Sequence, residues 1–226
     1  MQKLFWVVVC WLCLAPLSLA QSSDRRADFF VGYSNLQAEG VPDPNDPSNV
    51  FDEDFFDRRR GQHGVNAALA GYFNSAIGLK GDFSFHRNRN TTDLVGGRDA
   101  IENQTYYFMG GPVAKFRNAS RVEPFVHALF GGAHTRFELD SRRDLTSGTV
   151  RNNFNVGTTD FALAVGGGLD IRLTDRFSLR AFQVDYAPVF LGDRSISVLS
   201  NAGALVPLTL EGQRQDNVRF SIGVVF

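Results

Sequence analysis

The alternation of apolar residues at the C-terminus constrains this chain more than any other feature. In the closing segment NVRFSIGVVF, every second position is apolar, and the positions between are mostly small or polar. Successive side chains on a β-strand point to opposite faces. The segment therefore predicts a strand with one apolar face, ending on an aromatic C-terminal residue. The apolar side chains that we interpret as an assembly signal are Phe220, Ile222, Val224 and Phe226.

The first twenty residues predict a cleaved export signal. Lys3 precedes an apolar run over residues 4–14, and Ser18-Leu19-Ala20 supplies the small residues that a signal peptidase needs, so cleavage is expected after Ala20. The alternative is a membrane anchor helix. That run is too short to span a bilayer, and Pro16 interrupts it. Residues 21–27 are then a short N-terminal segment, and residues 28–226 form the main domain.

Composition excludes several classes of protein. Both cysteines lie in the leader, so the exported chain has no disulfide framework. The 23 basic and 24 acidic residues are nearly balanced and form no basic patch, which argues against nucleic-acid binding. No apolar run after Ala20 is long enough for a transmembrane helix. Strands therefore remain as the only candidate membrane-spanning element.

Alternation and turn-forming residues together predict eight strands. Most have about the 9–11 residues that a tilted strand needs to cross a bilayer. The predicted strands cover residues 28–36, 63–73, 76–86, 104–116, 123–135, 159–172, 176–187 and 215–226.

The connections between these strands alternate in length. Three are short, at residues 74–75, 117–122 and 173–175, and the rest are long and polar. Short turns on one rim and long loops on the other are typical of outer-membrane barrels, whose short turns face the periplasm. We therefore predict an all-β fold, an eight-stranded antiparallel up-and-down transmembrane barrel. Its long outer loops are expected at residues 37–62, 87–103, 136–158 and 188–214.

The two faces of the strands differ in chemistry. In residues 76–86, Ile77, Leu79, Phe83 and Phe85 share one face, and the other face carries Gly, Ser and charged residues. A soluble, lipocalin-like carrier would place the apolar face inside. The polar faces are too small and too sparsely charged for a solvated exterior, and they suit the crowded interior of an eight-stranded barrel. We therefore predict that the apolar face meets lipid.

Three strands are irregular. Pro112 removes a ladder hydrogen bond, so we expect a bulge or a frayed periplasmic end there. Arg180 and Gln183 can both point inward only with a bulge near Ala181-Phe182. The faces of strand 123–135 cannot be assigned, because apolar side chains occupy both.

Charged residues on the inner faces predict a salt-bridge network that fills the lumen, because buried charges are costly unless they are paired. A gate or a small-ligand site is the functional alternative. The lumen candidates are Lys80, Asp82, Lys115, Asp160, Asp170, Arg172, Arg180, Asp185 and Arg219.

Catalytic and metal sites are not expected, and no cofactor is implied. Ser84 and His86 share an inner face, but no acid is placed to orient the histidine. His127 and His134 are seven residues apart, which puts them on opposite faces of a strand and makes a poor metal site.

Two outer segments suggest binding. The run FDEDFFDRRR (51–60) places acidic residues beside three arginines and is either solvated or binds cations or lipopolysaccharide phosphates. The segments SISVLS and ALVPLTL in the last loop are apolar. They predict an extension of the last two strands above the membrane, with a partner-binding hairpin as the alternative.

The chain resembles the small OmpA/OmpX-type outer-membrane barrels. FFVGYSNL, GYFNSAIGLKGDFSFH, GGGLDIRLTDRFSLRAFQVDY and RFSIGVVF carry this resemblance, which covers residues 28–226. It implies a bacterial outer-membrane location and, as partners, outer-membrane lipid and lipopolysaccharide, the barrel assembly machinery and periplasmic chaperones. We expect a monomeric, non-enzymatic protein with a structural, envelope-integrity or adhesion role. The alternatives are a narrow gated, porin-like channel and a lipid-modifying enzyme.

Overall fold

The computed structural model describes residues 27–39, 59–94, 96–117, 120–145, 148–192, 194–199, 205–210 and 214–226. All regular secondary structure in these ranges is β-strand. The same ranges contain no helix with the length and apolarity that crossing a membrane requires. The predicted leader and its cleavage site lie outside the described residues, as does most of segment 37–62.

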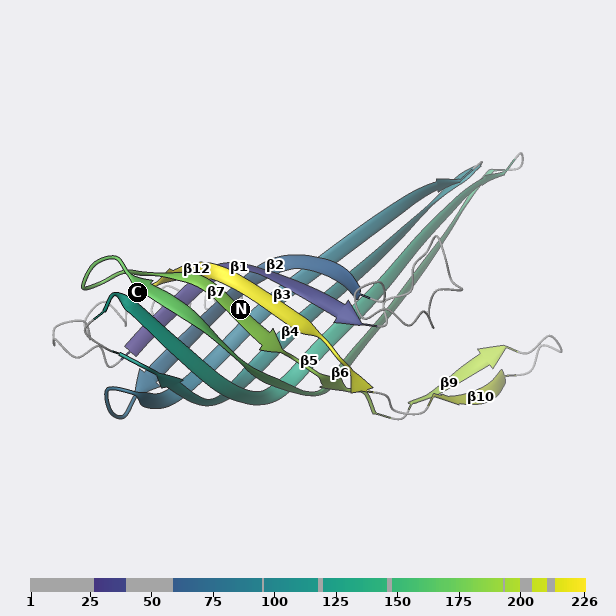
Figure 1. The fold of residues 1–226 in the computed structure, drawn as a ribbon. Coiled ribbons are helices and arrows are strands. Elements are labelled where there is room, and N and C mark those ends of the chain that lie inside the picture. Colours follow the sequence, from purple (N-terminus) through teal and green to yellow (C-terminus); the bar gives the residue numbers. More distant parts are fainter. Residues whose placement is uncertain are drawn as a thin grey trace, which may run out of the picture.

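Eight strands form a closed antiparallel ring (Figure 1). Each strand pairs with the next, and β12 pairs with both β7 and β1, which closes the sheet. Each predicted strand overlaps one strand of the ring, so the predicted eight-stranded barrel is confirmed. In ring order the strands are β1 (Ala27–Glu39), β2 (Arg59–Tyr72), β3 (Ile77–Leu94), β4 (Gly97–Lys115), β5 (Val122–Leu145), β6 (Gly148–Arg172), β7 (Ser178–Tyr186) and β12 (Val218–Val225).

The three short connections gather at one end of the ring, which we call the turn rim. They join β2 to β3, β4 to β5 and β6 to β7. The start of β1 and the C-terminus lie at the same rim, where Phe29 and Phe226 exchange backbone hydrogen bonds of 3.1 and 2.8 Å. We call the opposite end the loop rim.

Two of the predicted long loops are wrong. Residues 87–94 pair with 97–104 and residues 136–145 pair with 148–157, because the β3–β4 ladder runs to Leu94↔Gly97 and the β5–β6 ladder to Leu145↔Gly148. Figure 1 shows β3–β6 rising together far beyond the loop rim. We call residues 87–94, 97–104, 136–145 and 148–157 of these strands the extension.

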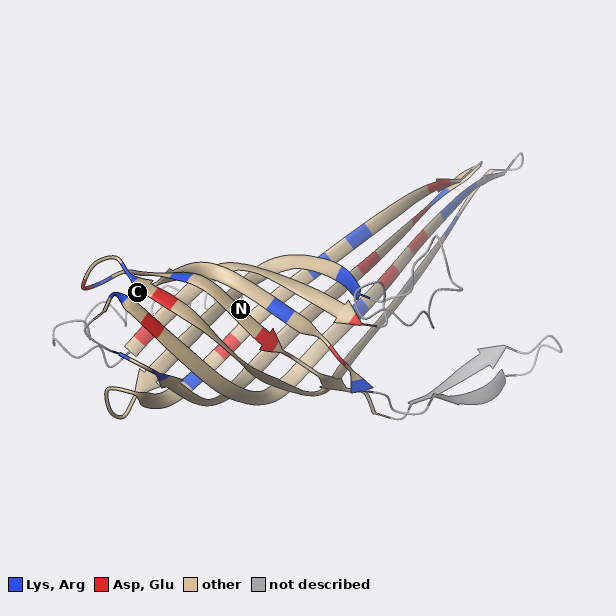
Figure 2. Cartoon of the chain, viewed as in Figure 1, with Lys and Arg blue, Asp and Glu red and all other residues tan. Residues whose placement is uncertain are grey.

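Paired charges explain why such polar segments form strands. Arg143 donates to both carboxylate oxygens of Asp99, at 2.5 and 2.8 Å, and Arg98 reaches Asp93 at 2.6 Å. Figure 2 shows both signs of charge distributed along the extension. Gly96 and Gly148 adopt positive φ angles of 77° and 137° at the hairpin ends, a conformation that glycine adopts without steric cost.

The outer wall of the ring is apolar, as predicted. Outward-facing Val65, Leu69, Phe83, Phe108 and Phe161 are 38–56% exposed. Their inward neighbours are small or polar, and most are buried. A water-soluble barrel would reverse this distribution, so the assignment of the apolar face to the outside is confirmed.

The predicted bulge in β7 is confirmed. The pairing with β6 changes from Leu169↔Phe182 to Asp170↔Arg180, which leaves Ala181 as the extra residue. The register with β12 shifts at the same place. As a result, Arg180 and Gln183 both point inward and are buried.

The other irregular strands are also defined. Phe125, His127 and Leu129 of β5 face the lumen with at most 4% exposure, so the faces that the sequence left open are assigned. The β4–β5 pairing lacks partners for residues 111–112 and resumes in the same register, so Pro112 makes a gap in the ladder and no bulge.

The last connection is more complex than a continuation of two strands. After β7, β8 (Val189–Phe190) pairs with β6 and with β11 (Arg214–Gln215). β9 (Arg194–Leu199) and β10 (Leu205–Leu210) form a separate two-stranded hairpin. The predicted simple extension of the last two strands is therefore wrong in part.

Candidate functional site in the barrel lumen

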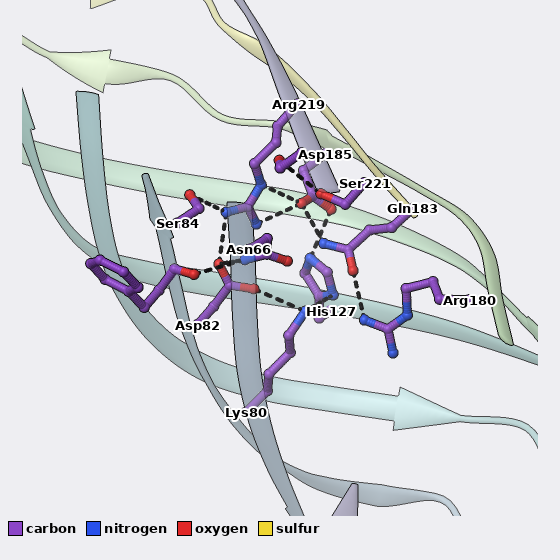
Figure 3. Close-up of polar contacts among 12 residues, drawn as sticks. Asn66, Lys80, Asp82, Ser84, His127, Arg180, Gln183, Asp185, Arg219 and Ser221 are labelled. Atoms are coloured by element: carbon purple, nitrogen blue, oxygen red, sulfur yellow. Dashed lines mark hydrogen bonds and ion pairs between the residues drawn. The ribbon is translucent and has the colours of Figure 1, made fainter. Parts of the chain in front are cut away.

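Arg219 of β12 is the centre of the buried charges in the lumen (Figure 3). Its Nη1 lies 2.7 Å from Asp82 Oδ1 and donates to Ser84 Oγ at 2.8 Å. Its Nε and Nη2 donate to Asp185 Oδ2 at 2.9 and 2.6 Å. Arg219 is fully buried. This fork geometry ties β12 to β3 and β7.

Each carboxylate around Arg219 has further partners. Lys80 Nζ lies 3.2 Å from Asp82 Oδ2, and Asn66 Nδ2 donates to Asp82 Oδ1 at 3.0 Å. His127 Nε2 lies 2.9 Å from Asp185 Oδ1. Several hydrogen bonds to each anion offset the cost of removing it from water.

A second cluster lies toward the turn rim. Lys115 Nζ lies 2.9 Å from Asp28, 3.0 Å from Asp170 and 3.3 Å from Glu123. Arg180 donates to both oxygens of Asp170, at 2.8 and 3.1 Å. All five residues are at most 6% exposed. This end of the lumen is therefore filled by paired charges.

Gln183 joins the two clusters into one network. It accepts from Arg180 Nη1 at 2.8 Å and donates to Asp185 Oδ2 at 2.7 Å. The Arg180 guanidinium also lies between the rings of Phe30 and Phe125, 4.2 and 4.1 Å from their centroids. Cation–π contact on both sides adds to its ion pair.

Apolar side chains close the lumen toward the loop rim. Leu36 of β1 belongs to the same buried cluster as Tyr107 of β4 and Leu129 of β5. Strand β1 stands opposite β4 and β5 in the ring, so this cluster, which we call the apolar plug, spans the bore. Its members are Leu36, Ala38, Tyr107, Met109, Leu129, Ala133, Ala162, Ala164, Ala187 and Val189.

Little open space remains in the charged part of the lumen. A void of about 10 Å³ lies among Asp28, Lys80 and Arg180. This volume is close to the minimum that holds one water molecule. Asp28 Oδ1, on this void, has no hydrogen-bond partner among the described residues, so a single water is the expected occupant.

The structure brings together seven of the nine lumen residues that the sequence singled out and places two apart. Asp160, near the loop rim, accepts from Thr158 Oγ1 at 2.9 Å. Arg172, at the turn rim, lies 3.4 Å from Glu123 and is 36% exposed. The buried seven are Lys80, Asp82, Lys115, Asp170, Arg180, Asp185 and Arg219.

Several network members were missed in the sequence. Asp28 and Glu123 stand at the ends of strands, where the sequence does not distinguish a lumen residue from a rim residue. His127 lies on the strand whose faces could not be assigned. The two glycines at positions 166 and 168 were an available signal in the sequence, because small residues on one strand make room for larger side chains on its neighbours, here β5 and β7.

The remaining histidines do not form a recognisable reaction centre. His86 Nε2 lies 2.9 Å from Ser34 Oγ, but both residues are fully buried and His86 Nδ1 meets no carboxylate among the described residues. His127 is inside and His134 outside, as the spacing predicted. Among the described residues, no group of three or more His, Asp or Glu side chains is arranged so that it could hold a metal ion.

The chain matches the profile of the outer membrane protein beta-barrel domain over residues 7–191. It belongs to this family. The match covers most of the chain and agrees with the closed ring and apolar outer wall. Membership implies a location in the bacterial outer membrane.

Several solved structures are similar to this chain at low sequence identity. Ail, the attachment invasion locus protein of Yersinia pestis, is 15% identical, with 88% of this chain and 97% of that chain covered and a TM-score of 0.48. Neisserial surface protein A is 11% identical (90% and 96% covered, TM-score 0.46). OprG from Pseudomonas aeruginosa is 12% identical (88% and 93% covered, TM-score 0.48). No curated protein sequence matches the chain.

Proposed function

We propose that this protein is a sealed, non-enzymatic barrel of the outer membrane that supports the envelope and presents its extension outside the cell. The observation that carries the proposal is the filling of the lumen from wall to wall. Paired charges fill the turn-rim end and the middle of the lumen, and the apolar plug, whose Leu36 pairs in register with Arg219, adjoins them toward the loop rim. An eight-stranded barrel has room only for its own side chains, which favours a stiff wall over a pore.

The apolar plug argues against the gated-channel alternative. Rearranging ion pairs alone would leave Leu36, Tyr107 and Leu129 across the bore. Planar-bilayer recording tests whether the lumen conducts ions. We expect no single-channel events from the refolded protein, because the paired charges and the apolar plug each block the lumen. Steady conductance of the unmodified protein would contradict the proposal.

The two rims support the proposal that the extension lies outside the cell. Barrels of this class keep both termini and their short turns in the periplasm, which puts β3–β6 beyond the opposite surface. Protease added to intact cells should cleave within a tag inserted between Thr146 and Ser147. Protection of that tag until the outer membrane is permeabilised would reverse the orientation.

Envelope support and adhesion can be separated by shortening the extension. Asn88 pairs with Asn103, and Phe137 pairs with Val156. Replacing residues 89–102 and 138–155 by two-residue Asn-Gly turns would keep the ring and remove the extension. If envelope support is the main role, this variant restores detergent resistance to a strain that lacks the protein. If adhesion is the main role, it folds but loses surface attachment.

Assembly is proposed to depend on the C-terminal strand. Phe220, Ile222, Val224 and Phe226 all point outward and are 37–53% exposed. They are therefore accessible to periplasmic chaperones and to the assembly machinery before insertion. Deleting Phe226 should lower the amount of folded barrel in cells much more than the yield of refolding in detergent. An equal loss in both would indicate a purely structural role.

A further inference from the structure

Two adjacent rows of outward-facing side chains mark the place where the ring passes into the extension. The row nearer the turn rim contains Phe85, Tyr106 and His134. Its ring centroids lie 4.8 Å apart for Phe85–Tyr106 and 6.1 Å apart for Tyr106–His134. We call it the aromatic row. Aromatic belts of this kind lie at the membrane–water interface.

The next row along the strands, further from the turn rim, is basic. The strand register places His63, Arg87, Gln104 and Arg136 side by side on β2–β5. We call these four residues the basic row. Adjacent strands are about 4.8 Å apart, so Arg87 and Arg136 stand about 10 Å apart. Directly above an aromatic belt, this row lies at the level of lipid headgroups.

Each arginine is held from the side away from the membrane. Arg87 Nη2 lies 2.6 Å from Glu102, and Arg136 Nε lies 2.8 Å from Glu138. The two glutamates face each other one row further out. The arginine side chains remain 48% and 44% exposed, and each guanidinium has further N–H groups. They are thus oriented while retaining donors for an anion.

A shallow apolar groove lies on the outer wall, between the aromatic row and the turn rim. Its volume is about 540 Å³, and its lining includes Leu69, Phe83 and Phe108 around Gly81. A Cβ added to Gly81 would meet no atom within 4 Å, so the floor of the groove is open. Gly81 lies six residues from Arg87 on the same strand. The groove has the place and the chemistry of an acyl-chain site.

We propose that the basic row and this groove bind a phosphorylated glycolipid of the outer leaflet, of the lipid A type. Its phosphates meet Arg87 and Arg136, and an acyl chain lies in the groove. Arginine forms strong, charge-assisted hydrogen bonds to phosphate. A headgroup with two phosphates fits two separated arginines better than a glycerophospholipid with one. The inference rests on the proposed outward orientation of the extension and is independent of the closed lumen.

The test uses the full exported chain refolded into phosphatidylcholine vesicles, with added diphosphoryl lipid A as the probe. The readout is the temperature at which the compact gel band converts to the unfolded band. We expect lipid A to raise this temperature and R87Q/R136Q to weaken the apparent affinity at least about tenfold, as the loss of two charged contacts predicts. Monophosphoryl lipid A should act more weakly than the diphosphoryl form.

Controls separate this site from general effects of charge and fold. The matched variant R98Q/R142Q removes two arginines from the same outer face, further from the membrane, and should respond like the unmodified protein. Gly81→Leu should fill the groove and weaken binding without removing charge. Equal responses of R87Q/R136Q and the unmodified protein, or an equal effect of phosphatidylglycerol, would overturn the proposal. Failure of the unmodified chain to form a compact band would instead contradict the proposed barrel function.

Discussion

Arg219 and Asp82 form a 2.7 Å ion pair across the lumen although 137 residues separate them in the sequence. Asp185 binds the other edge of the same guanidinium. One side chain therefore connects the last strand of the ring to its third and seventh strands. Such a contact can form only after the C-terminal strand has joined the sheet, which couples lumen packing to closure of the barrel.

Replacing Arg219 by Leu should destabilise the barrel by about 3–5 kcal/mol, because it leaves two buried carboxylates without their main cation. The midpoint of urea unfolding in detergent micelles measures this change. The matched control is Arg98→Leu, which removes an exposed ion pair with Asp93 and should cost about 1 kcal/mol or less. Equal midpoints for the two variants would contradict the network.

Asp170→Leu should also cost a few kcal/mol, because Lys115 and Arg180 lose their shared anion. Removing Arg180 as well should recover part of this loss, since the double variant leaves fewer unpaired charges in the lumen. Urea titration of Asp170→Leu, of Arg180→Leu and of the double variant gives the coupling energy. If the double variant loses more unfolding free energy than the two single variants lose together, Arg180 is held mainly by Phe30 and Phe125.

Glycine at position 166 is required by the close approach of β7. A Cβ there would lie 2.3 Å from both Asp185 Oδ1 and the Val184 carbonyl oxygen. Gly166→Ala should therefore displace β7 and lower the yield of refolded protein. Gly71→Ala is the control, because no atom lies within 4 Å of its added Cβ. If both variants refold with equal yield, β7 adjusts without loss.

The sequence predicted the ring well because its strands have one apolar and one polar face. Even the bulge at Ala181 could be predicted, since Arg180 and Gln183 had to share the lumen. The extension was missed because its strands carry polar residues on both faces, so alternation gives no signal there and paired charges resemble a polar loop. His127 was missed because β5 carries aromatic and aliphatic side chains on both faces, and only its pairing with β4 and β6 fixes which face is inside.

Substitution of Phe83 tests whether the outer wall of the ring faces lipid. It is 38% exposed and lies 5.1 Å from the Phe108 ring centroid. Phe83→Arg should cost roughly 2–4 kcal/mol if the residue lies near the middle of the bilayer. The folding yield in vesicles measures this, with Phe83→Leu as a control that keeps the surface apolar. A normal yield for the arginine variant would place this position at the interface.

Acid should loosen the extension through Asp99. The hydrogen bonds from Arg143 lower the pKa of the Asp99 carboxyl from its ordinary value of 3.8 to about 2. A carboxyl with a lowered pKa in the folded state stabilises that state above its ordinary pKa. This contribution is complete above about pH 5 and is lost as the pH falls toward 2. Amide hydrogen exchange near residues 97–99 and 141–143 should therefore accelerate over that range.

Arg143→Gln should return the pKa of Asp99 toward 3.8 and remove most of the acceleration between pH 4 and 2, because the ion pair is already absent. Acceleration that is identical in this variant would assign the acid response to another carboxyl, with Asp93, whose pKa is lowered by Arg98, as the next to test.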